Sequence, residues 1–148
     1  MYEFLKYVTG DVMTAPPVTI ASKASLAEAE RVFEDHDFNA LPVVAENGEL
    51  LGIVTKLDLL RAFRFTEEHL FPPYEEIMQG PVEAVMTRAP ITLTPRTPLT
   101  RALEKMLATR NKSLPVVENG RLVGMLARED VLRALRRAVG GERPHTPI

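Results

Sequence analysis

Hydrophobic and polar positions follow the same order twice along the chain. In the first copy, a β-prone run at Pro17–Ile20 precedes a segment with apolar residues three and four positions apart, which predicts an amphipathic helix. Two apolar runs, Leu41–Val44 and Leu50–Val54, predict a pair of strands, and another amphipathic segment predicts a closing helix. The apolar residues of the two helices are Leu26, Ala29 and Phe33, and then Leu59, Leu60 and Phe63.

The second copy begins at Pro90–Leu93 and repeats this βαββα order. Its strands are predicted at Leu114–Val117 and Leu122–Leu126. Pairing the two copies gives 20 identities in 50 positions, which is far above chance and indicates an internal duplication. The apolar residues of its two helices are Leu99, Ala102, Leu103, Met106 and Leu107, and then Leu132, Leu135 and Val139.

Turn and capping residues mark the ends of these elements. Each strand pair is joined by Asn-Gly, which favours a tight hairpin because both residues tolerate positive φ. A hydroxyl residue precedes the first helix of each copy, followed by a glutamate that completes a capping box in one copy and by a proline in the other. These residues are Asn47-Gly48 and Asn119-Gly120 in the turns, and Ser25, Glu28, Thr97 and Pro98 at the helix starts.

The duplication predicts an α+β fold. Neither copy of about fifty residues can bury its sheet alone. We therefore expect the two sheets to pack face to face with pseudo-twofold symmetry. The predicted organisation is a first repeat at 10–63, a linker at 64–80, a second repeat at 81–139 and a disordered tail at 140–148.

Composition narrows the class of protein. The 148 residues include no cysteine, which excludes disulfides and thiolate chemistry. The 18 basic and 20 acidic residues are spread along the chain, so we expect no nucleic-acid partner. No apolar run approaches the ~20 residues that span a bilayer. Residues 1–6 lack a signal-peptide pattern, so we expect a soluble cytoplasmic protein.

Catalytic and metal chemistry have no candidate residues. The three histidines, His36, His69 and His145, lack the spacing of a metal site. No nucleophile–base pattern or glycine-rich phosphate loop occurs. We therefore expect no metal, no catalytic cofactor and no enzymatic activity.

The segment with the most chemical content is the strand-to-helix turn Gly52–Asp58, with the sequence GIVTKLD. Helix N-termini attract phosphate through free N–H groups and a positive partial charge. Here Thr55 can donate to phosphate or sugar oxygens and Lys56 can add positive charge. Asp58 can accept hydrogen bonds from ribose hydroxyls.

Helix capping explains the same residues and is the favoured explanation on the local sequence alone. Thr55 and Asp58 have the spacing of a reciprocal cap, in which the hydroxyl bonds the N–H of the third helical residue. The second copy, Gly124–Asp130, retains the acid but has Ala127 in place of the threonine. On the local sequence both explanations stay open.

The repeated residues resemble a pair of CBS domains, the tandem regulatory unit known as a Bateman module. The resemblance rests on VMT before the first strand, on ALPVV and SLPVV, on the Asn-Gly hairpins and on GIVTKLD, and it covers about residues 10–138. It implies two clefts between the repeats that bind AMP, ADP, ATP, S-adenosylmethionine or related adenosyl compounds. The family motif of glycine, hydroxyl and aspartate is complete at Gly52, Thr55 and Asp58.

The resemblance also implies that each cleft is assembled crosswise from both repeats. In the second cleft, Ala127 weakens phosphate binding, which Arg128 can partly restore. The complete cleft would comprise Thr55, Lys56, Asp58, Thr87, Pro90, Ile91, Thr92, Asn111, Lys112, Ser113 and Pro115. The second would comprise Arg128, Asp130, Thr14, Pro17, Val18, Thr19, Phe38, Asn39 and Ala40.

Two functions follow from this resemblance. One is a non-catalytic sensor that binds an adenosyl ligand and signals to a separate protein. The other is a purely structural homodimerisation module without a ligand, in which Thr55 and Asp58 only cap a helix. Members of the family often form homodimers through their helices, so we expect a homodimer in either case.

Overall fold

This computed structural model describes residues 2–64, 73–142 and 144 and contains two antiparallel hairpins. β2 (Ala40–Val44) pairs with β3 (Leu50–Thr55), and β5 (Ser113–Glu118) pairs with β6 (Arg121–Ala127). Around them the chain forms two compact units: unit 1 contains residues 1–17 and 91–148, and unit 2 contains residues 18–90. The small sheets and flanking helices confirm the predicted α+β class.

Unit 2 is built on a four-stranded sheet of order β1-β2-β3-β4. β1 (Ile20–Ala21) is parallel to β2, and β4 (Thr87–Arg88) is antiparallel to β3. The predicted apolar face of α2 (Leu26–Asp35) is buried in this core, together with Leu41, Val43 and Val54 of the strands. The remaining helices are α3 (Lys56–Arg61), α4 (Tyr74–Met78) and the short η2 (Val82–Ala84).

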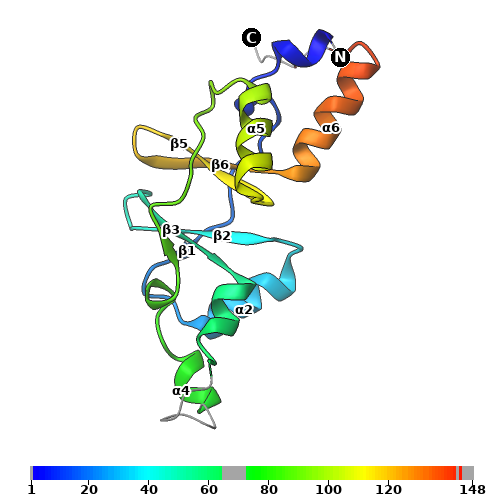
Figure 1. Ribbon diagram of the computed structural model, residues 1–148. Helices are drawn as coiled ribbons and strands as arrows, with labels where there is room; N and C mark the ends of the chain where they lie inside the picture. The colour runs from blue at the N-terminus through cyan, green and yellow to red at the C-terminus, as the bar shows by residue number, and fades with distance from the viewer. Residues whose placement is uncertain (1, 65–72, 143, 145–148) are drawn as a thin grey trace. The chain divides into compact units, whose positions relative to one another are not determined.

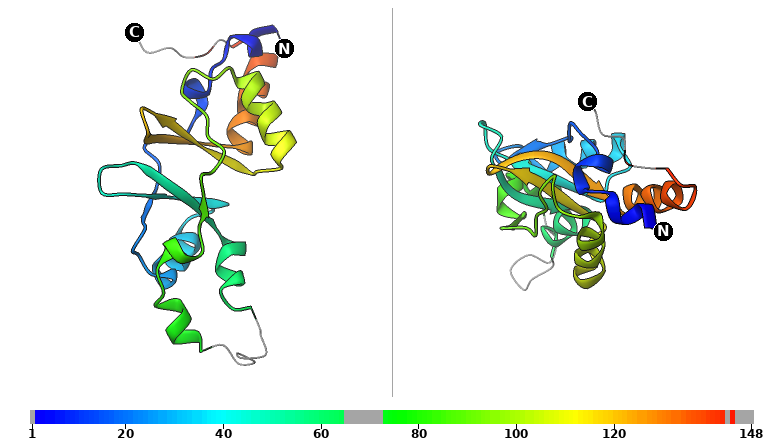
Figure 2. Two further views of the ribbon diagram at one scale, coloured as in Figure 1. Left: turned by 60° about the vertical axis from the view of Figure 1, so that its left-hand side comes forward. Right: turned by 90° about the horizontal axis from the view of Figure 1, so that it is seen from above.

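Unit 1 is built on the β5–β6 hairpin. Helices α5 (Leu99–Thr109) and α6 (Arg128–Val139) lie on the same side of this hairpin (Figure 1). The N-terminal η1 (Tyr2–Lys6) lies beside the C-terminal end of α6 (Figure 2) and is followed by α1 (Thr9–Val12). The Tyr7 hydroxyl there donates to the Glu142 carbonyl at 3.1 Å.

Each unit incorporates the leading segment of the other repeat. Residues 2–17 include the start of the first repeat but pack in unit 1, whereas residues 74–90 include the start of the second repeat and pack in unit 2. The same three backbone hydrogen bonds fix both segments. They run from Leu99 N to Tyr7 O, Thr9 N to Thr97 O and Gly10 N to Pro95 O in unit 1, and from Leu26 N to Gly80 O, Val82 N to Ala24 O and Glu83 N to Ser22 O in unit 2.

A glycine on the second strand of each hairpin admits the exchanged segment. A Cβ on Gly52 would lie 2.6 Å from the Thr87 carbonyl oxygen and 2.8 Å from the Met86 sulfur. On Gly124 it would lie 2.6 Å from the Met13 sulfur and 3.0 Å from the Thr14 carbonyl oxygen. The glycine of the repeated motif is therefore required for packing against the repeated VMT segment.

The strand and turn predictions are correct in part. Of the two β-prone runs after prolines, only the last residues pair, Ile20 with Val43 and Leu93 with Val116. The predicted Asn119-Gly120 turn has positive φ at both residues, at 54° and 79°. In the first hairpin, the connection between the equivalent paired residues is one residue longer, and only Gly48 of the Asn47-Gly48 turn has positive φ.

Helix predictions are correct in part. Ser25 caps α2 by accepting from Glu28 N at 3.1 Å. Thr97 does not cap α5, because the cap is Pro98 and the threonine hydroxyl accepts from Thr94 N. Residues 64–80, the expected linker, include α4, and Met78 of α4 is buried. Of the expected tail, residues 143 and 145–148 lie outside the described residues.

The apolar face of α6 also differs from the prediction. Leu132 and Val139 are 62% and 70% exposed. The residues that reach the core are Val131, Ala134 and Ala138. Two apolar stripes lie side by side on this helix, and periodicity alone did not distinguish the buried one.

Gly52→Ala is expected to lower the free energy of unfolding by about 1–3 kcal/mol, because the added methyl meets a backbone carbonyl. Gly124→Ala should cost less, since its nearest obstacle is the flexible end of a methionine side chain. Urea unfolding of the two variants would measure the difference. Equal losses would contradict this account of the exchanged segments.

Candidate functional site

The turn from β3 into α3 holds a complete hydroxyl–acid pair. The Asp58 Oδ2 accepts from the Thr55 backbone N–H at 2.8 Å and from the Thr55 hydroxyl at 3.0 Å. In return the Thr55 Oγ1 lies 3.2 Å from the Asp58 backbone nitrogen and accepts from it. The capping role considered from the sequence is therefore confirmed.

Only one oxygen of the Asp58 carboxylate takes part in the cap. Its other oxygen, Oδ1, lies 3.3 Å from Nη1 of Arg61, one turn further along α3. The residue is only 3% exposed, and a buried charge is stable only when it is paired or hydrogen-bonded. Oδ1 is thus the atom through which this acid can meet a further donor.

The corresponding turn of the second repeat lacks the hydroxyl. Asp130 Oδ2 accepts from the Ala127 backbone N–H at 2.8 Å, and its Oδ1 lies 3.3 Å from Nη1 of Arg133. This turn therefore has the acid's half of the cap but no hydroxyl to accept from the third helical N–H. Both acids keep the same geometry, so the two turns differ in chemistry chiefly at positions 55 and 127.

Two of the three candidate cations, Lys56 and Arg128, are engaged within their own units. The Lys56 ammonium lies over the Phe33 ring of α2, 5.9 Å from its centroid. The Arg128 guanidinium donates to the Arg110 carbonyl at the end of α5, at 3.0 Å. Lys56 is exposed and held only by a weak cation–π contact. It is the freer of the two to contact an anion.

The residues predicted for the complete cleft are divided between the units. Unit 2 contains Thr55, Lys56, Asp58, Thr87 and Pro90, and the β3–β4 pairing places Thr87 opposite Ile53, two residues before Thr55. The other predicted residues of this cleft belong to unit 1: Ile91, Thr92, Asn111, Lys112, Ser113 and Pro115.

Residues of the second predicted cleft are divided in the same way. In unit 1, Lys112 and Ser113 of the complete cleft lie beside the start of α6. There the backbone N–H of Arg128, a residue of the second cleft, donates to the Lys112 carbonyl at 3.0 Å. Unit 2 pairs Ala40 with Thr55 and stacks Phe38 on His36 at a ring separation of 4.8 Å. Of the second cleft, Thr14, Pro17, Arg128 and Asp130 lie in unit 1, and Val18, Thr19, Phe38, Asn39 and Ala40 lie in unit 2.

The sequence reasoning missed the two arginines that contact the acids. Arg61 and Arg133 stand three residues after Asp58 and Asp130, which places them on the same helix face. Their identity in both copies was the available signal. Among the described residues, no three His, Cys, Asp or Glu side chains converge as metal ligands do.

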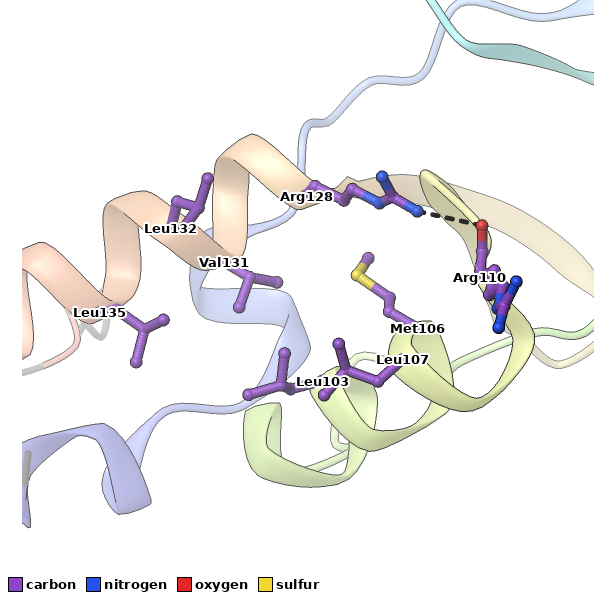
Figure 3. A pocket seen from close by; sticks show the side chains of 8 residues that line it. All are labelled: Leu103, Met106, Leu107, Arg110, Arg128, Val131, Leu132 and Leu135. Atoms are coloured by element: carbon purple, nitrogen blue, oxygen red, sulfur yellow. Dashed lines mark hydrogen bonds between the residues drawn. The ribbon is translucent and has the colours of Figure 1, made fainter.

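A separate apolar groove runs between α5 and α6 in unit 1 (Figure 3). Its volume is about 300 Å³, and the Arg128–Arg110 hydrogen bond crosses one end. Leu107 and Leu132 on its two walls are 70% and 62% exposed. The lining residues are Leu103, Met106, Leu107, Arg110, Arg128, Val131, Leu132 and Leu135.

Comparison with known proteins identifies the family. The family model for the CBS domain matches residues 8–64 and 82–137, and the chain therefore belongs to the CBS domain family, as a tandem pair. A CBS domain-containing protein of Dictyostelium discoideum is 31% identical over 134 residues, which cover 88% of this chain and 92% of that one. None of the described helices is long and apolar enough to cross a membrane.

Two similar solved structures contain adenosyl compounds. CBSX2 in complex with AMP has a TM-score of 0.77 and 29% identity, covering 90% of this chain and 98% of that one. The CBS domain pair of MJ0100, in complex with 5′-methylthioadenosine and S-adenosyl-L-methionine, has a TM-score of 0.69 and 30% identity, covering 91% and 97%.

Some relatives are named as enzymes, but this chain spans a small part of them. L-aspartate semialdehyde sulfurtransferase of Methanocaldococcus jannaschii is 32% identical over 124 residues, which is 83% of this chain and 22% of that enzyme. The A-adding tRNA nucleotidyltransferase of Aquifex aeolicus is 29% identical over 134 residues, 90% of this chain and 15% of that enzyme. The shared part is the CBS pair.

Ala127→Thr is expected to stabilise the protein by about 1 kcal/mol, because the new hydroxyl can accept from the third N–H of α6, as Thr55 does in α3. Thermal and urea unfolding would measure the gain. The same substitution at exposed Ala108, inside α5, should instead cost a few tenths of a kcal/mol. A loss of stability in Ala127→Thr would show that this turn cannot hold a hydroxyl cap.

Proposed function

We propose that this chain is a non-catalytic regulatory module that binds an adenine nucleotide or another adenosyl compound and signals to a separate protein. The observation that carries the proposal is the complete hydroxyl–acid pair of Thr55 and Asp58. Similar CBS pairs in complex with AMP, 5′-methylthioadenosine and S-adenosyl-L-methionine support this choice of ligand.

Each group at the β3–α3 turn has a separate task in this proposal. The ribose hydroxyls donate to Asp58 Oδ1, while Oδ2 keeps the helix cap. The Thr55 hydroxyl turns its proton from Asp58 Oδ2 to the phosphate, while the Thr55 backbone N–H stays on Oδ2. The Lys56 ammonium also meets the phosphate, which the helix N-terminus favours. The second turn offers an acid without the hydroxyl, so we propose that it prefers an adenosyl group without phosphate.

Signalling requires that the ligand prefers one state of the protein over another. A ligand shifts a conformational equilibrium only through its different affinities for the two states. The resemblance assigns adenine contacts to residues of unit 1, among them Asn111 and Ser113. A ligand held by both units would therefore favour one arrangement of the units, and a partner that recognises that arrangement would detect it.

Wild-type protein is expected to bind AMP with a dissociation constant in the micromolar range, measured by isothermal titration calorimetry. Asp58→Asn should weaken binding at least about tenfold, because the charge-assisted bonds to ribose are lost while the amide can still accept from Thr55 N. Asp130→Asn is the matched control, with a similar effect on capping and little effect on AMP. Absence of heat with AMP, ATP and S-adenosylmethionine would contradict the proposal.

We further propose that the module is a homodimer joined through the α5–α6 groove. The groove exposes a continuous apolar surface, which soluble proteins usually cover. A second copy presents the same surface, as a twofold interface requires. The same observation supports the alternative function, a structural dimerisation module without a ligand.

Leu132→Glu is expected to convert the dimer to a monomer, because it replaces an apolar contact of the interface with a carboxylate that would lose its hydration there. Sedimentation velocity across a concentration series would measure the change. Tyr2→Glu is the control, since Tyr2 is 74% exposed but lies outside the groove. If Leu132→Glu stays dimeric, the interface lies elsewhere.

A further inference from the structure

The two oxygens of the Asp58 carboxylate have different partners. Oδ2 is held by the Thr55 backbone and hydroxyl, both within 3.0 Å. Oδ1 is met by Arg61, whose Nη1 lies 3.3 Å away. A ligand that donates to this acid without breaking the helix cap must therefore use the oxygen that Arg61 now contacts.

The arrangement occurs twice. Asp130 and Arg133 repeat the 3.3 Å contact in the second repeat, although the hydroxyl at the start of that helix is absent. The contact therefore does not depend on the hydroxyl. It follows from the acid at the third helical position and an arginine one turn later, which both copies share.

The contact between Arg61 and Asp58 is long, and the arginine can leave it easily. Charge-assisted N–H···O bonds are commonly about 2.7–2.9 Å long, shorter than the 3.3 Å observed here. The Arg61 side chain is 57% exposed, whereas that of Asp58 is 4% exposed. The guanidinium can therefore turn into water at little cost, but the carboxylate needs a replacement donor when it does.

We propose that Arg61 is a positioning residue that occupies Oδ1 of Asp58 in the free protein and is displaced by the hydroxyls of a bound ribose. The inference rests on the proposed function. Arg61 keeps the buried acid paired and correctly aimed while no ligand is present. It also lowers the affinity for every ribose-containing ligand, because each must first displace it.

The test uses two phosphate-free probes, so that attraction between the guanidinium and a phosphate plays no part. Arg61→Met should bind adenosine about two- to fivefold more tightly than wild type, the factor expected for removing a weak ion pair whose arginine is exposed. Its affinity for 2′,3′-dideoxyadenosine should not change, because that probe lacks the 2′- and 3′-hydroxyls that would donate to Oδ1. NMR titration measures both affinities even where they are low.

Arg64→Met is the matched control. It removes the same charge three residues further along, where no contact with Asp58 exists, and should leave both affinities at the wild-type value. Equal or weaker adenosine binding by Arg61→Met, in a protein whose wild type binds adenosine, would overturn the role of Arg61 alone. Failure of the wild type to bind adenosine and AMP would overturn the proposed function together with it.

Discussion

The close approach of a methionine–threonine segment to a strand glycine organises this protein. Met86 and Thr87 lie against Gly52, and Met13 and Thr14 lie against Gly124, at distances that leave no room for a Cβ. Each contact joins the leading segment of one repeat to the hairpin of the other. Neither repeat is therefore a complete packing unit, and the duplication forms two units only because the segments are exchanged.

The same constraint positions part of the candidate site. β4 can pair with β3 only where Gly52 leaves space for it. This pairing places Thr87 opposite Ile53, two residues before Thr55. The strand then ends in a helix whose first turn needs an acid for its cap. Under the proposed function, stability and ligand binding would thus depend on one residue, Asp58, whose two oxygens allow the two roles to be divided between them.

The sequence predicted the features that depend on local chemistry. Ser25 as a cap, the Asn119-Gly120 turn and the buried face of α2 follow from turn and helix geometry alone. Features that depend on distant partners could not be predicted in this way. β4 is two residues long and is a strand only because it pairs with β3. The exposure of Leu132 depends on which of the two apolar stripes of α6 faces the hairpin. The choice between cap and ligand site at Asp58 was undecided because one geometry serves both.

Under the proposed function, the division of roles at Asp58 would also link ligand binding to the protein surface. If a ribose takes Oδ1, the helix cap on Oδ2 stays intact, so α3 need not unfold or move. The group that changes its contacts is the Arg61 guanidinium, which is already more than half exposed. A partner that recognises this arginine would distinguish the free from the bound module without a large conformational change. A carboxylate with one structural and one exchangeable oxygen is therefore sufficient to report occupancy.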